Sequence, residues 1–195
     1  MNSQVERTLV LIKPDGVQRG LIGEVIKRFE QRAIKIVALK MIKPSLEAFS
    51  NHYPSTDEWF EKLGEKGFKT FADLHIDAKE AMGTEDRVEV GKQVKKWLVN
   101  YMTQAPIVAI VLEGIHAVSI TRKIVGPTLP SQAEIGTIRG DFSADSPAAA
   151  NLEKRAVKNV VHASESKAEA EREIYQWFSE EEIFEWERPD HKVMY

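Results

Sequence analysis

The stretch that decides the fold is Thr8–Glu30, TLVLIKPDGVQRGLIGEVIKRFE. It begins with a short β-branched, apolar run, Thr8–Ile12, which ends at the turn-forming residues Lys13–Gly16. This pattern predicts a buried strand followed by a tight turn. Apolar residues then recur between Leu21 and Phe29 at helical spacing, with charged residues between them. The stretch therefore predicts a strand, a lysine-bearing turn and an amphipathic helix.

Further strand and helix signals extend outward from this stretch. Short β-rich or apolar runs predict strands at Ile34–Ile42, Ile107–Leu112 and Asn159–Ala163. Helical spacing or capping signals predict helices that begin at Ser45 and Ser166, and helices over Asp86–Met102 and Ala117–Ile124. The order of these elements favours an α/β chain built as an α+β sandwich. A ferredoxin-like βαββαβ core, with a four-stranded antiparallel sheet and a helical insertion, fits the predicted strands.

Two segments of the chain read as connections. Gly126–Gly140 is rich in glycine and proline and predicts a long ordered loop. Ser143–Ala150 is small and polar, and we expect a flexible insertion there. We expect residues 1–195 to form a single domain, with the helical insertion at about residues 64–104.

Composition excludes several classes of protein. The chain has 195 residues, of which 43% are apolar, and its net charge is −3. This balance gives no global reason to expect a nucleic acid or an acidic membrane as partner. The absence of cysteine excludes disulfides, thiolate metal sites and cysteine nucleophiles. No apolar run approaches the roughly 18 residues that cross a bilayer, so we expect a cytoplasmic protein.

His162 is the first candidate for chemistry, because imidazole is both a nucleophile and a base at physiological pH. A buried histidine bonded to a main-chain carbonyl is the structural alternative. Glu173 projects beside the apolar stripe of the helix that begins at Ser166, where a carboxylate needs a partner. His162 lies just ahead of that helix and could be this partner. Glu173 could instead reach solvent or form a structural ion pair.

Three cations form a second candidate group. Lys13, Arg122 and Arg139 each fall at a predicted element end or in the long loop. If they converge near the histidine, they suit a phosphate chain, because arginine binds oxyanions in a bidentate manner and lysine supplies a point charge. Each of them alone could equally be a surface cation. The chain has no Walker-type loop and no protein-kinase signature, so phosphate chemistry would need another scaffold.

The segment of about residues 64–104 carries no nucleophile, phosphate loop or metal-binding spacing. Gly64, Gly67 and Gly83 punctuate it, so its first half is difficult to assign. Its second half has an apolar stripe at helical spacing, formed by Val90, Val94, Trp97, Leu98 and Tyr101. Such a stripe must pack on its own domain or on a neighbouring subunit. We expect this segment to shape packing or access and to contribute no catalytic group.

Three ordered motifs resemble the nucleoside diphosphate kinase family. They are the opening stretch, VGPTLPSQAEIGTIRGDF at residues 125–142, and NVVHASES at residues 159–166. The resemblance covers about residues 6–63, 105–142 and 157–188. The segments at about 64–104 and 143–156 are longer than compact members of the family need.

The resemblance implies a ferredoxin-like core and a ping-pong transfer of the γ-phosphate from a nucleoside triphosphate to a nucleoside diphosphate. It makes His162 the phosphate acceptor, oriented by Glu173, with Ser164 completing the hydrogen-bonded set. It also places Lys13 in the catalytic set. The remaining positions that the resemblance assigns to nucleotide binding are Tyr53, Trp59, Leu63, Arg122, Thr128, Arg139 and Asn159.

Within that set, Trp59 and Leu63 stand where the family clamps the base, after a one-residue shortening. The usual glycine after the histidine is Ala163, and the usual aspartate after the serine is Glu165. The resemblance implies Mg²⁺ that is carried by the nucleotide phosphates and not held in a protein cage. It also implies ATP and other nucleoside di- and triphosphates as partners, and a homo-oligomer built from dimers into a tetramer or hexamer. No membrane and no obligate nucleic acid are expected.

Two alternatives remain at this point. A nucleotide-sensing or nucleic-acid-binding module on the same fold would have no use for His162 beside Glu173, and would need exposed aromatic residues on a strand. A catalytically inactive homologue is the other alternative, and the intact set of His162, Ser164 and Glu173 argues against it.

Overall fold

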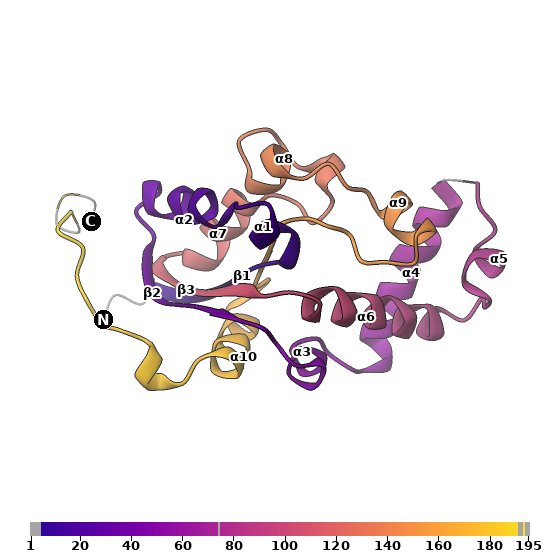
Figure 1. The fold of residues 1–195 in the computed structure, drawn as a ribbon, viewed down its shortest axis with the longest axis horizontal. Coiled ribbons are helices and arrows are strands. Elements are labelled where there is room, and N and C mark those ends of the chain that lie inside the picture. The colour runs from indigo at the N-terminus through magenta and orange to yellow at the C-terminus, as the bar shows by residue number, and fades with distance from the viewer. Residues whose placement is uncertain (1–4, 74, 191–192, 194–195) are drawn as a thin grey trace. The chain divides into compact units, whose positions relative to one another are not determined.

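The computed structural model describes residues 5–73, 75–190 and 193. Four strands form one sheet in the order β2-β3-β1-β4, and each neighbouring pair is antiparallel (Figure 1). The strands are β1 (Val5–Ile12), β2 (Lys35–Ile42), β3 (Ile107–Ile115) and β4 (Val161–Ala163). The predicted four-stranded antiparallel sheet of the ferredoxin-like type is confirmed.

The chain divides into two compact units, and each is described by itself. The sheet unit consists of Met1–Ile42, Pro106–Ser143 and Asn159–Tyr195. The helical unit consists of Lys43–Ala105 and Ala144–Lys158. Both segments that exceed the compact family pattern therefore contribute to the helical unit. Within the described residues, none of the helices has the length and apolar character needed to span a bilayer.

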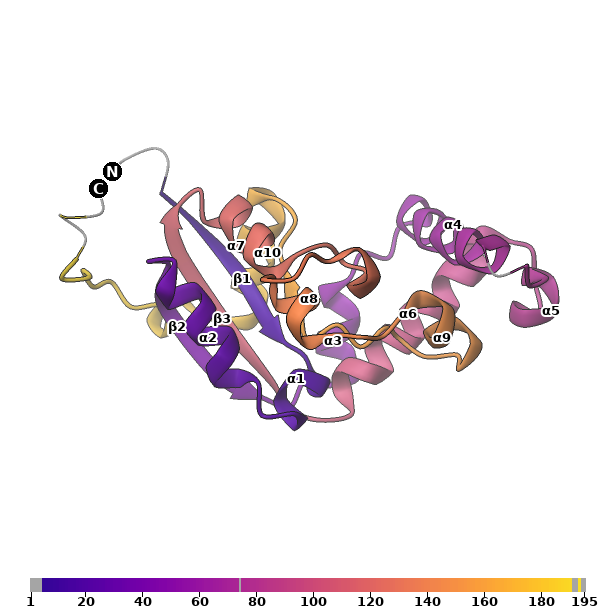
Figure 2. The same ribbon diagram turned by 90° about the horizontal axis from the view of Figure 1, so that it is seen from above.

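The sheet of the sheet unit is covered on both faces. Successive residues of β1 point to opposite faces, and Val10 and Ile12 belong to a core shared with α2 (Ile22–Gln31) and α7 (Ala117–Val125). The helix α10 (Lys167–Trp177) contacts β1 on the other face. Figure 1 shows α2 and α7 on one side of the sheet and α10 on the other, and Figure 2 looks down onto the side that α2 covers.

Two predicted connections of the sheet unit contain helix. The expected turn at Lys13–Gly16 is the start of α1 (Pro14–Gln18), where the fixed φ of Pro14 suits the first helical position. The expected loop Gly126–Gly140 contains the 3-10 helix η1 (Pro130–Gln132) and runs into α8 (Ile138–Phe142). The Thr137 side chain accepts a hydrogen bond from the N–H of Gly140 and so caps α8. A second 3-10 helix, η2 (Glu180–Glu182), follows α10.

The helical unit is held together by the close crossing of two long helices. Its elements are α3 (Leu46–His52), α4 (Asp57–Asp73), α5 (Ala78–Met82), α6 (Arg87–Thr103) and α9 (Pro147–Leu152). A β-carbon added at Gly64 would lie 1.9 Å from the Arg87 carbonyl oxygen, and one added at Gly91 would lie 2.0 Å from the Phe60 carbonyl oxygen. Gly64 and Gly67 therefore do not interrupt α4, and Gly64 lets the backbone of α6 approach.

The apolar stripe of α6 packs within the helical unit. Val90 forms a buried cluster with Phe71 and Met82, and Val94 and Trp97 pack against it. The expected flexible insertion Ser143–Ala150 was wrong, because it contains the start of α9. The Ser146 side chain caps this helix, Ala150 is buried, and α9 contacts α4.

Candidate active site

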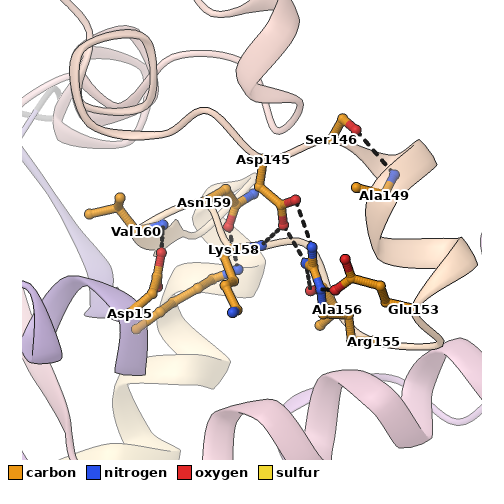
Figure 3. Close-up of polar contacts among 11 residues, drawn as sticks. Asp15, Asp145, Ser146, Ala149, Glu153, Arg155, Ala156, Lys158, Asn159 and Val160 are labelled. Atoms are coloured by element: carbon orange, nitrogen blue, oxygen red, sulfur yellow. Dashed lines mark hydrogen bonds and ion pairs between the residues drawn. The ribbon is translucent and has the colours of Figure 1, made fainter.

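The site of the sheet unit begins at a strained turn before β4. Val160 has φ of +66°, and the N–H of Val161 donates to the Asn159 carbonyl oxygen at 2.7 Å across it. The main chain of Val160 is fixed from α1 and its N-terminal cap. Its carbonyl accepts from Lys13 N at 2.8 Å. Its N–H donates to Asp15 Oδ2 at 3.1 Å, as Figure 3 shows. A positive φ at a β-branched residue costs about 1–3 kcal/mol. These two contacts help to hold it.

His162 faces α10 because of its place in the sheet. It lies opposite Leu11 in the antiparallel register, two residues beyond the strained turn. Its Nε2 lies 3.0 Å from Oε2 and 3.2 Å from Oε1 of Glu173. The Ser164 hydroxyl donates to Oε2 of the same carboxylate at 2.7 Å. The structure therefore brings together the predicted set of His162, Glu173 and Ser164.

The partner of Nε2 decides which nitrogen of His162 holds a lone pair. A carboxylate can only accept hydrogen bonds, so with Glu173 as acceptor the proton lies on Nε2. The lone pair is then on Nδ1. Glu173 and Ser164 are buried, while the side chain of His162 is 19% exposed. The ring is thus fixed on its buried side and partly open to solvent.

Lys13 and Asn159 form a buried polar contact beside this strand. Lys13 Nζ donates to Asn159 Oδ1 at 2.6 Å, and Asn159 Nδ2 donates to the Thr128 carbonyl at 2.7 Å. Burial, together with repulsion from Arg139, lowers the pKa of Lys13 to about 7, although Asp15 acts in the opposite direction. Lys13 is therefore poised to gain charge when an anion binds.

Arg139 supports the same segment through main-chain carbonyls. Its guanidinium donates to the carbonyl oxygens of Val161 at 2.7 Å, Gly126 at 2.8 Å and Asn159 at 3.4 Å. Burial and repulsion from Arg122 lower the pKa of Arg139 to about 10, against the attraction of Glu165, so it remains charged at neutral pH. These bonds use one N–H on each nitrogen.

The three predicted cations are therefore close enough to influence one another. Arg139 interacts electrostatically with both Lys13 and Arg122. Lys13 and Arg139 are buried, Arg122 is exposed, and so is Thr128. Like charges gathered in this way cost free energy unless an anion joins them, which is typical of an oxyanion site.

The residues assigned to the base lie in the helical unit. Tyr53 follows α3 directly, and Trp59 and Leu63 lie four residues apart near the start of α4, on one face of that helix. The rings of Tyr53 and Trp59 stack with centroids 5.9 Å apart and an interplanar angle of 26°. Trp59 and Leu63 are half-buried.

Sequence reasoning missed several polar side chains that hold these segments. Asp15 belongs to the quoted opening stretch, and an aspartate in a first helical turn was the available signal. The Asp145 carboxylate accepts hydrogen bonds from Arg155 Nη1 at 2.5 Å, from Arg155 Nη2 at 3.0 Å and from the Lys158 N–H at 2.7 Å (Figure 3). This contact closes residues 145–158 of the helical unit, and no spacing rule predicts it. Lys95 was also missed.

A histidine fixed by a carboxylate, beside three interacting cations on a ferredoxin-like sheet, is the arrangement expected of a phosphoryl-transfer enzyme. Known proteins agree with this class. The model of the nucleoside diphosphate kinase family matches residues 6–64 and 56–183. The nucleoside diphosphate kinase of Pyrobaculum aerophilum is 55% identical over 181 residues, which is 93% of this chain and 99% of that protein. The enzyme of Archaeoglobus fulgidus is 40% identical over 191 residues, 98% of each chain.

Solved structures give the same result. An NDP kinase from Pyrobaculum aerophilum has a TM-score of 0.91 at 54% identity, covering 93% of this chain and all of that one. A nucleoside-diphosphate kinase from Borrelia burgdorferi, in a transition state mimic with bound vanadate and ADP, has a TM-score of 0.78 at 33% identity, covering 97% and 96%. The chain belongs to the nucleoside diphosphate kinase family. It is a phosphotransferase of a family that acts on nucleotides and uses a divalent cation.

Proposed function

We propose that this protein moves the γ-phosphate of a nucleoside triphosphate to a nucleoside diphosphate through a phosphohistidine at Nδ1 of His162. The carrying observation is the contact between Nε2 and Glu173, which leaves the lone pair on Nδ1. In the first half-reaction Nδ1 forms a bond to the γ-phosphorus. The bond to the oxygen that bridges the β- and γ-phosphates breaks, and the diphosphate leaves with its electron pair. The second half-reaction is the reverse, with another diphosphate as acceptor.

The remaining residues position the substrate and neutralise its charge. Glu173 and Ser164 orient the imidazole ring. Lys13 and Asn159 bind the ribose hydroxyls, and Lys13 also meets the phosphates, whose charge holds its ammonium protonated. The other proposed phosphate ligands are Arg122, Thr128 and Arg139. Arg139 retains two N–H groups beyond those that donate to described carbonyls.

Tyr53, Trp59 and Leu63 are proposed to contact the base. An aromatic ring and an aliphatic side chain offer stacking and apolar contact without a hydrogen-bond code, so we expect low selectivity among bases.

The donor set fits Mg²⁺ that arrives with the nucleotide. Arg139 interacts electrostatically with Lys13 and with Arg122, and cationic side chains such as these bind phosphate oxygens and not a metal ion. When bound to the nucleotide, Mg²⁺ would neutralise charge on the phosphate oxygens.

We further propose that residues 1–195 form one domain with a helical insertion, that the protein is cytoplasmic, and that it assembles as a dimer-based homo-oligomer.

A nucleic-acid-binding module is not favoured. Such modules stack bases on exposed aromatic residues of a sheet. The four described strands carry no Phe, Tyr or Trp.

Labelling with γ-³²P-ATP tests the proposal. We expect wild-type protein to acquire an acid-labile, alkali-stable label that a nucleoside diphosphate removes, and the His162→Ala variant to remain unlabelled. An unlabelled wild type, or an equally labelled variant, contradicts the assignment.

A further inference from the structure

Lys95 is a buried lysine that the proposed mechanism does not use. It lies in the middle of α6, in the segment of about residues 64–104, and its side chain is almost fully removed from solvent. Lys92 and Lys96 lie on the same helix and are exposed. Lys92 forms an ion pair with Glu89 on the same helix. A buried ammonium is costly unless hydrogen bonds replace its hydration, so the contacts of Lys95 indicate what it does.

The ammonium of Lys95 is bound to the connection between α3 and α4. Nζ lies 2.5 Å from Ser55 Oγ, 3.1 Å from the Pro54 carbonyl oxygen and 3.2 Å from the Tyr53 carbonyl oxygen. Oxygen atoms of three consecutive residues thus accept hydrogen bonds from one nitrogen, which has three hydrogens to donate. This geometry fixes the conformation of the connection.

The same ammonium faces the aromatic side chains that follow. It lies 6.0 Å from the ring centroid of Trp59 and 5.7 Å from that of Phe60, within the range of a cation–π interaction. Tyr53 and Trp59 stack on each other across the fixed connection. Lys95 therefore contacts the backbone of the first aromatic residue and the ring face of the second.

We propose that Lys95 is a positioning residue that holds Tyr53 and Trp59 in their base-binding arrangement and thereby sets the affinity for nucleotides. This inference rests on the proposed role of the two aromatic residues. Without Lys95 the connection gains conformational freedom, and nucleotide binding must then order it again. The protein then binds the base of the nucleotide less tightly, while the rate of phosphoryl transfer at His162 is unchanged once the nucleotide is saturating.

The helical insertion would thus supply the side chain that positions the proposed base-binding residues. We expected this segment to shape packing or access without a catalytic group, and Lys95 is compatible with that expectation because it touches neither the phosphates nor His162 in the proposed mechanism. It acts through Tyr53, Pro54 and Ser55. The prediction is therefore a change in apparent affinity and not in the rate of phosphoryl transfer at saturation.

The test compares Lys95→Met with Lys96→Met, a matched change one residue along the same helix. We expect Lys95→Met to raise the KM for ATP and for ADP by about ten-fold, the scale of a lost supporting contact, with kcat within about two-fold. Inhibition by inorganic tripolyphosphate, which has no base, should be unchanged. Lys96→Met should change none of these quantities. Lys95→Arg, which keeps the charge and its donors, should recover part of the loss.

Several outcomes would overturn the inference. They are an unchanged KM in folded Lys95→Met, an equal effect of Lys96→Met, or tripolyphosphate inhibition weakened in parallel with ATP binding, which would indicate general damage. If Lys95→Met does not fold, Ser55→Ala decides, because it removes one acceptor only. A smaller rise in KM with unchanged tripolyphosphate inhibition supports the inference, and no rise contradicts it. Failure of the wild type to form phosphohistidine would instead contradict the proposed function.

Discussion

The sheet unit and the helical unit hold their proposed functional side chains by different means. In the sheet unit, main-chain atoms at strand ends do this: register directs His162 towards α10, and contacts from α1 and its cap hold the strained Val160. In the helical unit, the aromatic residues depend on the crossing of α4 and α6 at Gly64 and Gly91 and on one buried lysine. The functional side chains of the first unit are thus held by strand register and main-chain hydrogen bonds, whereas those of the second depend on a helix crossing and on the side chain of Lys95.

The largest expected effect concerns the sheet unit. His162→Ala should still bind nucleotide, because the cations and the aromatic residues remain. It should form no phosphoenzyme, and transfer should fall by about a thousand-fold or more, the scale for loss of a nucleophile. Binding is measured by calorimetry with ADP, and transfer by single-turnover labelling. Transfer at the wild-type rate by the purified variant would move the chemistry away from this unit.

Gly91→Ala should disrupt the helical unit. The new methyl group would overlap the Phe60 carbonyl oxygen, a backbone atom that cannot move aside as a side chain can. Forcing a group into a close contact costs typically about 1–3 kcal/mol, and a backbone clash should reach or exceed the upper end. Urea unfolding followed by circular dichroism measures the loss.

The matched control for this change lies in the sheet unit. A β-carbon at Gly23 in α2 would meet nothing within 4 Å. Gly23→Ala should therefore be neutral or stabilise by up to about 1 kcal/mol. Equal stability of the Gly91 and Gly23 variants would show that the close crossing is not what holds the helical unit together.

The contrast between the units also explains what the sequence could predict. The four strands of the sheet unit and its helices α2, α7 and α10 followed from hydrophobic period and capping signals, whereas α1 and α8 lie where a turn and a loop were expected. The spacing of Glu173 beside an apolar stripe correctly suggested His162 as its partner, because the two lie in adjacent elements. The strained turn at Val160 was not predictable, since valine is among the residues least suited to a positive φ.

In the helical unit the same rules predicted α3 and α6, but they did not predict how α4 packs. Gly64 read as an interruption, because the sequence does not show that Arg87 must approach it. The contacts of Asp145 with Arg155 and of Lys95 with Ser55 join residues about ten and forty positions apart, and no local pattern encodes them. Motif resemblance supplied the candidates Trp59 and Leu63, but not what supports them.

Glu173→Gln tests whether ring orientation is separable from the fold. Glutamine keeps the volume, but its amide no longer offers a carboxylate oxygen pair to both His162 and Ser164. We expect the single-turnover rate of phosphorylation to fall by about ten-fold or more, with little change in nucleotide affinity. Glu171→Gln on the exposed face of α10 is the control and should have no effect. An unchanged rate in Glu173→Gln would reduce Glu173 to a structural partner.

Lys13 makes nucleotide binding depend on pH. Its pKa in the folded chain is depressed to about 7, so the side chain loses its proton as pH rises through that value. A bound phosphate chain favours the charged form, so binding should take up a proton between pH 7 and the higher pKa of the complex. Affinity should fall by up to about ten-fold per pH unit above 7.

Calorimetry of ADP binding near pH 8, in buffers with different ionisation enthalpies, measures this uptake. Lys13→Met should abolish it, and uptake that persists in the variant would assign the proton to another group. The same lowered pKa acts on stability with the opposite sign. The unfolded chain binds more protons between pH 7 and the ordinary lysine pKa, so the Lys13 contribution to stability rises with pH in that window.

The smallest expected effect concerns an exception within the sheet unit. Thr121 in α7 is fully buried, and its hydroxyl has no hydrogen-bond partner among the residues that the structure describes. Thr137 is the opposite case, since its hydroxyl donates to the Glu134 carbonyl and accepts from the Gly140 N–H.

Thr121→Val replaces a desolvated hydroxyl by a methyl group of similar volume, and should stabilise the fold by about 1 kcal/mol. Thr137→Val removes a helix cap and should destabilise by about the same amount. For a chain of this size each change should move Tm by about 2–4 °C, in opposite directions. If both variants lower Tm, hydrogen bonds to main-chain atoms do not decide whether a buried threonine stabilises the sheet unit. The proposed difference between the two units, main-chain contacts in one and a helix crossing in the other, would then lack support.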